Sequence, residues 1–341
     1  MPVAFIVAVL LAVVIAGWYR AQQPVVHAIN GWTMGSTWSL RVAGPRDLDL
    51  VTLRTQLEAQ LGELDSQLSG YRDNTALSRL NNAPVGEWVE LPSHLGAVLR
   101  FGRQLHDDTA GAFDLTVKPL VNLWGFGAAD PRSTLPTDAE IAAAKARTGA
   151  RQLEISADGT RVRRLAAVGV DVDVDAVAPG YAADVLAGWL DAHGLPDHLV
   201  EIGGEMRAGG ARPDGGGWRI GIERPVMARG DVGQVIAVHD GGVATSGDYR
   251  DFVEIGGHRY SHTLDPVSGR PVTHELASVT VIAADGLAAD GYATALMVLG
   301  PERGMAWAEA RRLPVFMIIR TANGELAERY NEAFRPFLVT E

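Results

Sequence analysis

The sequence has no cysteine among its 341 residues. A chain without cysteine has no disulfide, no thiolate metal ligand, no cysteine nucleophile and no lipid-modified cysteine anchor, but this absence fits either redox compartment. Positive charge is also scarce, because 30 Lys and Arg stand against 41 Asp and Glu, for a net charge of −11. Nucleic-acid binders carry a basic face, so this balance argues against one. It remains compatible with an anionic nucleotide whose phosphates are neutralised by a metal or by helix ends.

Several motifs of nucleotide binding and hydrolysis are missing as well. There is no P-loop, and Ile202-Gly203-Gly204 lacks the rest of the dinucleotide-binding fingerprint. Ser246 lies in Thr-Ser-Gly-Asp and not in a nucleophile elbow, which gives a serine hydrolase little support. The chain also has no internal repeat at a fixed period, no low-complexity tract and no block of like charge.

Long apolar runs are absent except at the N-terminus, where Val3 to Ala16 is almost wholly aliphatic. This run is short for a membrane-spanning helix and suits the hydrophobic region of a signal peptide. Trp18 and Tyr19 equally suit the interfacial belt of an uncleaved anchor. No Lys or Arg precedes the run and Arg20 follows it, so the positive-inside rule does not favour an inside N-terminus. We predict that residues 1–22 are a signal peptide or membrane anchor, with a buried core helix as the alternative.

The rest of the chain is rich enough in apolar residues for a sizeable core, since they make up 47% of the sequence. Predicted helices cover residues 52–69, 93–106, 179–193, 287–299 and 301–311, and a capping box at residues 137–140 opens another. Predicted strands cover a pair within 31–42, then 152–155, 160–165, 199–202, 218–222, 234–239, 253–255, 278–282 and 315–319. Helices and strands do not alternate regularly, which favours an α+β fold over a doubly wound sheet.

The stretch from Val170 to Gly204 is predicted to form a strand, a tight loop, a helix and a second strand. Asp171, Asp173 and Asp175 alternate with valines, so their side chains share one face of an extended segment. The pattern also resembles the start of an EF-hand loop, but alanines at the sixth and twelfth positions exclude calcium binding of that type. A carboxylate segment that runs into an uncapped helix N-terminus can hold a cation beside a phosphate. The alternative is an ordinary βαβ unit with a charged strand end.

Two further pairs of polar residues have spacings that suit chemistry. Asp290 and Thr294 are four apart on a predicted helix, and a carboxylate and a hydroxyl on one face are oxygen ligands suited to Mg²⁺. Threonine is also a common helix residue without a function. His258 and His262 have the spacing of zinc helices, but the flanking glycines and proline argue against a helix and hence against zinc. His262 alone is a candidate general base or a satisfied buried histidine.

Seven segments, taken in order, resemble the ApbE family of FAD:protein FMN transferases. The resemblance covers the chain from about Trp32 to the C-terminal region. The segments are Thr33 to Thr37, Thr109 to Asp114, Pro119 to Gly127, Val170 to Gly204, Ala244 to Tyr249, Ser261 to Pro266 and Ala289 to Leu296. The resemblance implies an α+β fold with mixed or antiparallel sheets and flanking helices, similar to a T-fold. It also implies a single catalytic domain over residues 27–338 that follows the apolar leader.

The resemblance implies a Mg²⁺-dependent enzyme on the periplasmic side of the bacterial inner membrane. It would bind FAD, release AMP and attach FMN to a threonine or serine of an acceptor protein, expected to be a membrane respiratory subunit. By position, His262 matches the proton acceptor of the family. The implied metal ligands are the carbonyl of Ala178, with Asp290 and Thr294. The implied flavin contacts are Met34, Tyr71, Ala112, Phe113, Asp114, Asp175, Tyr181 and Leu264, which leaves Asp171 and Asp173 in structural or solvated roles.

One position departs from the family pattern, because many members have a lysine where this chain has Pro179. The change removes a charge from the mouth of the implied site. Proline suits the first turn of a helix, and it disfavours helical conformation at Ala178 before it. The sequence leaves two alternatives to transfer open. One is an FAD pyrophosphatase that uses water as the nucleophile, and the other is a non-catalytic flavin-binding protein.

Overall fold

The computed structural model describes residues 23–126, 134–165, 170–225, 230–248, 252–255 and 258–339. The predicted leader at residues 1–22 lies outside this part of the chain, in which no helix is long and apolar enough to cross a membrane. At the centre is an eight-stranded sheet in the order β1-β2-β6-β7-β10-β15-β16-β17. All neighbouring strands in it run antiparallel. The predicted α+β class is therefore confirmed.

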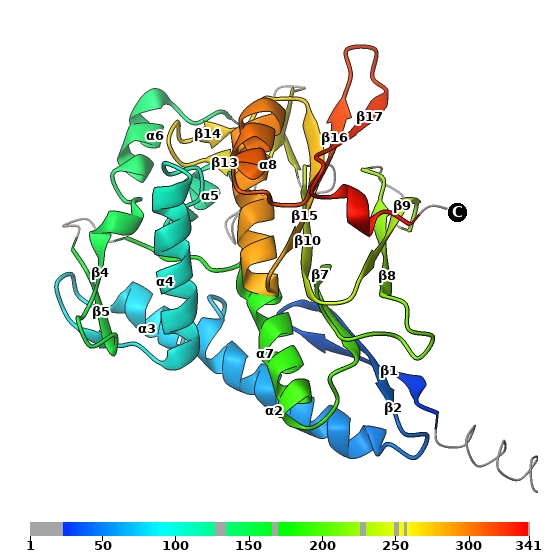
Figure 1. Ribbon diagram of the computed structural model, residues 1–341. Coiled ribbons are helices and arrows are strands. Elements are labelled where there is room, and N and C mark those ends of the chain that lie inside the picture. The colour runs from blue at the N-terminus through cyan, green and yellow to red at the C-terminus, as the bar shows by residue number, and fades with distance from the viewer. Residues whose placement is uncertain are drawn as a thin grey trace, which may run out of the picture.

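The strands of this sheet come from both ends of the chain. The long excursion between the second and third of them in sequence builds most of the helical layer (Figure 1). The strands are β1 (Val25–Thr33), β2 (Ser36–Gly44), β6 (His198–Ile202), β7 (Glu205–Gly209), β10 (Gly241–Gly247), β15 (Leu276–Ala283), β16 (Val315–Arg320) and β17 (Leu326–Tyr330).

Helices α7 (Ala178–Ala192) and α8 (Gly286–Ala310) pack against one face of the sheet, and α2 (Leu50–Leu68) and α4 (Ser93–Asp108) pack on them in turn (Figure 1). The five leucines that predicted α2 are all buried, and Asp49 caps its first turn by accepting from the N–H groups of Val51 and Thr52. The two predicted C-terminal helices form one element, α8, with a kink where Gly300 adopts φ 79° before Pro301.

A hairpin covers the opposite face of the sheet. It consists of β8 (Trp218–Glu223) and β9 (Val232–Val238), and the short η2 (Arg335–Phe337) lies beside it. Alternate residues of β8 are buried, so Trp218, Ile220 and Ile222 pack with Phe316 and Phe334 in one apolar cluster. The middle of the central sheet is thus buried on both faces, which makes it a rigid support for the loops at its ends.

Shorter elements complete the described chain. The predicted capping box is present, with Thr137 and Glu140 bonded reciprocally at the start of α6 (Asp138–Lys145). A three-stranded sheet has the order β3-β5-β4. The remaining elements are α3 (Ala76–Asn82), α5 (Lys118–Leu123), η1 (Ala150–Gln152), β3 (Val89–Glu90), β4 (Leu153–Ile155), β5 (Arg161–Arg164), β11 (Phe252–Ile255), β12 (His258–Ser261), β13 (Leu264–Asp265) and β14 (Arg270–Pro271).

The prediction of a strand over the first part of Val170–Gly204 is wrong. Val172 and Val174 are fully buried, as the alternation requires, but residues 170–174 join no sheet. The Asn81 side chain binds both backbone groups of Val172, and the Asp173 N–H donates to the Leu115 carbonyl, so other partners replace a strand ladder. The βαβ alternative is therefore also wrong, because the extended segment has no parallel partner.

Candidate functional site

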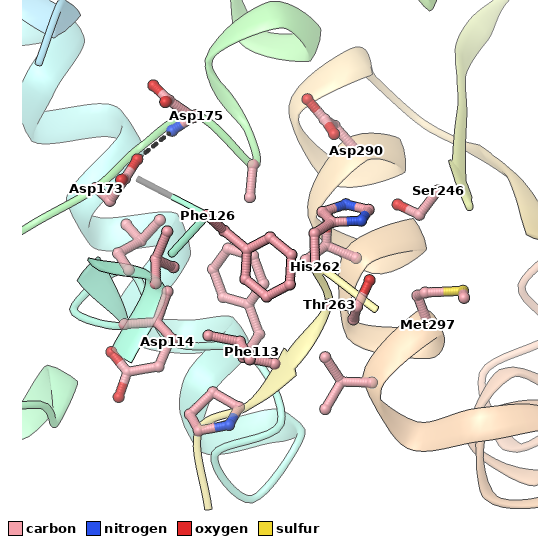
Figure 2. Close-up of a pocket in the computed structure, with 18 of the residues that line it drawn as sticks. Phe113, Asp114, Phe126, Asp173, Asp175, Ser246, His262, Thr263, Asp290 and Met297 are labelled. Carbon is pink, nitrogen blue, oxygen red and sulfur yellow. Dashed lines mark hydrogen bonds between the residues drawn. The ribbon is translucent and has the colours of Figure 1, made fainter. Parts of the chain in front are cut away.

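A cavity of about 900 Å³ opens between the N-terminal parts of α7 and α8 and the loops around α5 and β13. A cavity of this size suits a cofactor-sized ligand. Its wall has two chemically different parts (Figure 2). Acidic side chains lie along one side, and aromatic and aliphatic side chains form the rest.

The apolar part contains three of the predicted flavin contacts, Ala112, Phe113 and Leu264. Backbone geometry aims the first two into the cavity, since Ala110 (φ 52°) and Gly111 (φ 86°) form a left-handed turn directly after α4. Phe126, three residues after the end of α5, also lines the cavity (Figure 2). Apolar side chains around two aromatic rings are suited to a planar aromatic ligand.

Asp114 also lines the cavity, but its carboxylate is already engaged. Its Oδ1 accepts from the Thr116 N–H (2.8 Å) and from the Thr116 hydroxyl (2.6 Å), and the side chain is almost fully buried. In Figure 2 the carboxylate points away from the centre of the cavity. If Asp114 contacts a ligand as predicted, it does so through atoms other than Oδ1.

Asp173 and Asp175 form one edge of the acidic part, and the Asp175 N–H donates to the Asp173 carboxylate at 3.0 Å (Figure 2). Burial and the neighbouring charge of Asp173 raise the pKa of Asp175. Its Oδ2 accepts from the hydroxyl of Tyr71 (2.8 Å), and this bond raises the pKa of Tyr71 to about 12. Asp171 points elsewhere and pairs with Arg147 at 2.7 Å. Asp173, expected in a structural or solvated role, instead lines the cavity.

Asp290 and Thr294 lie on one face of α8 and both line the cavity, as their spacing predicts. Asp290 is buried, and its Oδ2 accepts from the Gly180 N–H in the first turn of α7 (3.1 Å). Burial and then the charge of Glu205 raise the pKa of Asp290 well above its ordinary value. Within the described residues, no ion pair is formed by Asp290 or Glu205, and the described lining of the cavity contains no Lys or Arg.

Glu205, at the start of β7, is a site residue that the sequence patterns did not predict. It lines the cavity, and burial and the nearby Glu201 raise its pKa to about 7. Its position follows from Gly203 (φ 67°) and Gly204 (φ 114°), which turn the chain between β6 and β7 beside the start of α7. The signal that could have found it is an acidic residue directly after a Gly-Gly turn, next to the segment already considered functional.

His262 lies in the bend between β12 and β13 and lines the cavity beside Thr263. Its ring meets Phe126 edge-on, with 6.4 Å between ring centroids. Figure 2 shows the imidazole between Phe126 and the helix that carries Asp290. The histidine therefore sits where the apolar and acidic parts of the cavity meet. The side chain of His258, the other half of the rejected zinc pair, lies outside the described residues.

Four predicted site residues do not line the cavity. Met34 lies in the β1–β2 turn with φ 48°, and Tyr181 bonds through its hydroxyl to Nδ1 of His94 on α4 (2.9 Å). Tyr71 is exposed and reaches the site only through Asp175. Ala178 is the first residue of α7, so the expected extended conformation before Pro179 is wrong. Pro179 itself occupies the first turn of α7, as predicted, and lines the cavity.

The family profile, the related sequences and the related structures all point to one protein family. The sequence profile of the ApbE family matches residues 34–317. An FAD:protein FMN transferase of Vibrio cholerae is 40% identical over 335 residues, which are 98% of each chain. One of Klebsiella pneumoniae is 38% identical and covers 100% of this chain and 99% of its own. The apo crystal structure of the Pseudomonas stutzeri flavinyl transferase ApbE has a TM-score of 0.83 at 42% identity, covering 92% of this chain and 97% of that one.

The antiparallel sheet with its helical layer and acid-lined cavity thus defines an α+β domain of the flavin transferase type. The chain belongs to the ApbE family, and like its named relatives it is an enzyme of the transferase class.

Proposed function

We propose that this enzyme transfers FMN from FAD to a threonine or serine hydroxyl of an acceptor protein and releases AMP. One observation carries the proposal: a single cavity joins an aromatic wall to five acidic side chains, with no Lys or Arg in its described lining. The aromatic wall suits the flavin ring, and the acidic edge suits a pyrophosphate only if cations lie between them. The names of the relatives support the same reaction.

The acidic edge fits a divalent cation. The described residues contain no group of three or more His, Asp or Glu side chains that could hold a metal by themselves. A buried carboxylate (Asp290) and a hydroxyl (Thr294) that both line the cavity are instead oxygen ligands of the kind that Mg²⁺ takes alongside water and phosphate. The third expected ligand is the backbone carbonyl of Ala178, which is the first residue of α7 and lies outside the cavity lining. When bound, Mg²⁺ would neutralise charge on the pyrophosphate and on the departing AMP.

The side chains at the cavity have separate roles in flavin binding and in proton transfer. Phe113, Phe126 and Leu264 bind and orient the flavin and exclude water from it. An imidazole nitrogen of His262 accepts the proton of the acceptor hydroxyl while the hydroxyl oxygen forms a bond to the FMN phosphorus. The bond between this phosphorus and the bridging oxygen breaks, and AMP leaves with that oxygen. The proton stays on His262 until it is lost to solvent.

For the location, we propose the periplasmic side of the bacterial inner membrane. The support is the aliphatic run at Val3 to Ala16, which suits a signal peptide or an anchor. An acceptor exposed on that side, such as a subunit of a membrane respiratory complex, fits an enzyme held in the same place. Proteolytic mapping of the chain in intact spheroplasts tests this location, and protection of the whole domain would contradict it.

The direct test is incubation of the full-length chain with FAD, Mg²⁺ and a candidate acceptor protein. Mass spectrometry of the acceptor should show one added FMN phosphoryl group on Thr or Ser, together with one AMP per transfer. Free FMN and AMP without acceptor modification would indicate a pyrophosphatase that uses water. FAD binding with neither product would indicate a flavin-binding protein without catalysis. Either outcome would overturn the proposal.

A further inference from the structure

Helices α7 and α8 cross at their first turns through two glycines. A Cβ placed on Gly180 would lie 2.3 Å from the Gly286 carbonyl oxygen, and one placed on Gly286 would lie 2.4 Å from the Gly180 carbonyl oxygen. No side chain larger than hydrogen fits at either position without moving the helices apart. The two backbones are therefore in direct contact beside the acidic edge of the cavity.

The same five-residue pattern starts at each of these glycines. Residues 180–184 are Gly-Tyr-Ala-Ala-Asp, and residues 286–290 are Gly-Leu-Ala-Ala-Asp. The aspartate lies four residues after the glycine, on the same face of its helix, and helical side chains lean towards the N-terminus. Each aspartate therefore points back at the crossing, where the other helix begins.

The two aspartates bind the opposite helix reciprocally. Asp184 of α7 accepts from the N–H groups of Gly286 (2.6 Å) and Leu287 (2.8 Å) at the start of α8. Asp290 of α8 accepts from the N–H of Gly180 at the start of α7 (3.1 Å). The first N–H groups of a helix have no partner within it, and the helix dipole favours negative charge there. We name Gly180, Asp184, Gly286 and Asp290 the helix clasp.

The two halves of the clasp have similar sequences, but their aspartates differ in the contacts that they make. Both oxygens of Asp184 are occupied, and Arg207 lies 3.6 Å away from it. Asp290 uses Oδ2 alone, and its carboxyl group lines the cavity with no basic side chain beside it in the described chain. Asp184 therefore joins the helices and has both oxygens engaged, whereas Asp290 has one oxygen left for a ligand.

We propose that Asp184 is a positioning residue for the cation site, because it locks α8 against α7 in the arrangement that brings Asp290 and Thr294 to the start of α7. This inference rests on the proposed function. Asp290 and Thr294 come from α8, and the expected carbonyl ligand of Ala178 comes from α7, so the geometry of the cation site would depend on how these helices cross. Mg²⁺ demands near-ideal octahedral geometry at short distances and is sensitive to small shifts of its ligands.

The test is Mg²⁺ binding to the full-length chain measured by isothermal titration calorimetry in the presence of FAD, with the transfer rate as a second readout. Asp184→Asn keeps the size of the side chain but loses the charge and one acceptor oxygen. We expect its Mg²⁺ dissociation constant to rise about tenfold, the size of effect typical of groups that orient metal ligands. Its affinity for FAD without Mg²⁺ should stay within about twofold of the wild type.

Asp285→Asn is the matched control. Asp285 caps the same helix end by accepting from the Ala288 N–H (2.8 Å), but it is exposed and bonds only to its own helix. The Asp285→Asn variant should have a slightly lower melting temperature and a Mg²⁺ affinity within about twofold of the wild type. If Asp184→Asn does not fold by circular dichroism, Asp184→Glu, which keeps the charge and displaces it, takes its place with the same expected direction.

Three outcomes are distinguishable. Weakened Mg²⁺ binding in the Asp184 variant but not in Asp285→Asn supports the positioning role. A lower melting temperature with unchanged Mg²⁺ affinity would show that Asp184 is only structural, and would overturn this inference while the proposed function stands. A wild-type chain that binds Mg²⁺ and FAD but transfers no FMN would overturn the proposed function and leave the positioning role to be decided by calorimetry.

Discussion

Asp290 is the side chain on which two separate interactions converge. It caps α7 through Gly180 and presents its carboxyl group to the acidic edge of the cavity. Asp290→Asn keeps an oxygen for the cap and removes the charge. We expect the FMN transfer rate to fall at least about 100-fold, more than for a group that only orients a ligand. Initial rates across a Mg²⁺ titration measure this effect.

Thr294→Val is the comparison variant for Asp290, since it preserves the β-branched shape of a residue one turn along the same helix. It removes one neutral oxygen, so its rate should fall less, by about tenfold. Equal transfer by the wild type and by both variants would show that the cation site lies elsewhere.

His262 is expected to act in proton transfer and not in flavin binding. His262→Gln should lower the transfer rate by about 10² to 10⁴, the usual contribution of a general base. FAD affinity, followed by quenching of flavin fluorescence, should change by no more than about threefold. A rate that falls only because FAD no longer binds would contradict this role and would assign His262 to the cavity wall beside Phe126.

Pro179 lies at a cavity whose described lining has no Lys or Arg. Pro179→Lys adds one positive charge near the expected pyrophosphate and should tighten FAD binding about fivefold, or roughly 1 kcal/mol for one partly exposed charge. Pro179→Ala controls for the loss of the ring. Fluorescence titration decides the matter, and equal affinities for the lysine and alanine variants would show that the site works without this charge.

Among the helices, α7 offers a matched pair of glycines. Gly180→Ala places a methyl group against the Gly286 carbonyl and should destabilise the chain by about 2 kcal/mol or more. Gly188 has no atom within 4 Å of an added Cβ, so Gly188→Ala should be stabilising by up to about 1 kcal/mol. Urea unfolding measures both. Equal effects would show that the α7–α8 crossing is not as close as the structure indicates.

For the molecule as a whole, two half-buried carboxyl groups couple stability to pH. Burial raises the pKa of Asp184 to about 6 and that of Glu205 to about 7, from ordinary values of 3.8 and 4.5. The folded chain holds these protons more tightly than the unfolded chain. Their contribution to stability is therefore complete below about pH 4 and is lost as pH rises through 6 and then 7.

Without Mg²⁺, we expect the free energy of unfolding to fall by on the order of 2 kcal/mol from these groups between pH 5 and pH 7.5. Urea unfolding at each pH measures it. Glu205→Gln should reduce this fall, because the amide does not ionise. Mg²⁺ should raise the melting temperature more at pH 7.5 than at pH 5, since it binds deprotonated ligands. A Mg²⁺ effect independent of pH would contradict the proposed role of these acids.

Local patterns were enough to determine much of this protein. The leucine spacing of α2, the capping box of α6 and the lack of βαβ alternation all predicted what the structure contains, because each depends on residues a few positions apart. The spacing of Asp290 and Thr294 likewise placed both on the cavity. Strands such as β10, rich in glycine and small residues, escaped prediction because their stability comes from their neighbours in the sheet.

Only the tertiary structure determined which distant segments lie beside one another. The acidic stretch before α7 is not a strand, because Asn81 and Leu115 supply its hydrogen bonds. Glu205 became a site residue only when β7 was brought beside α8. The clasp joins residues about a hundred positions apart, and its bonds exist only because two glycines let the helix backbones touch. Sequence determined which groups were available, and packing determined which of them meet.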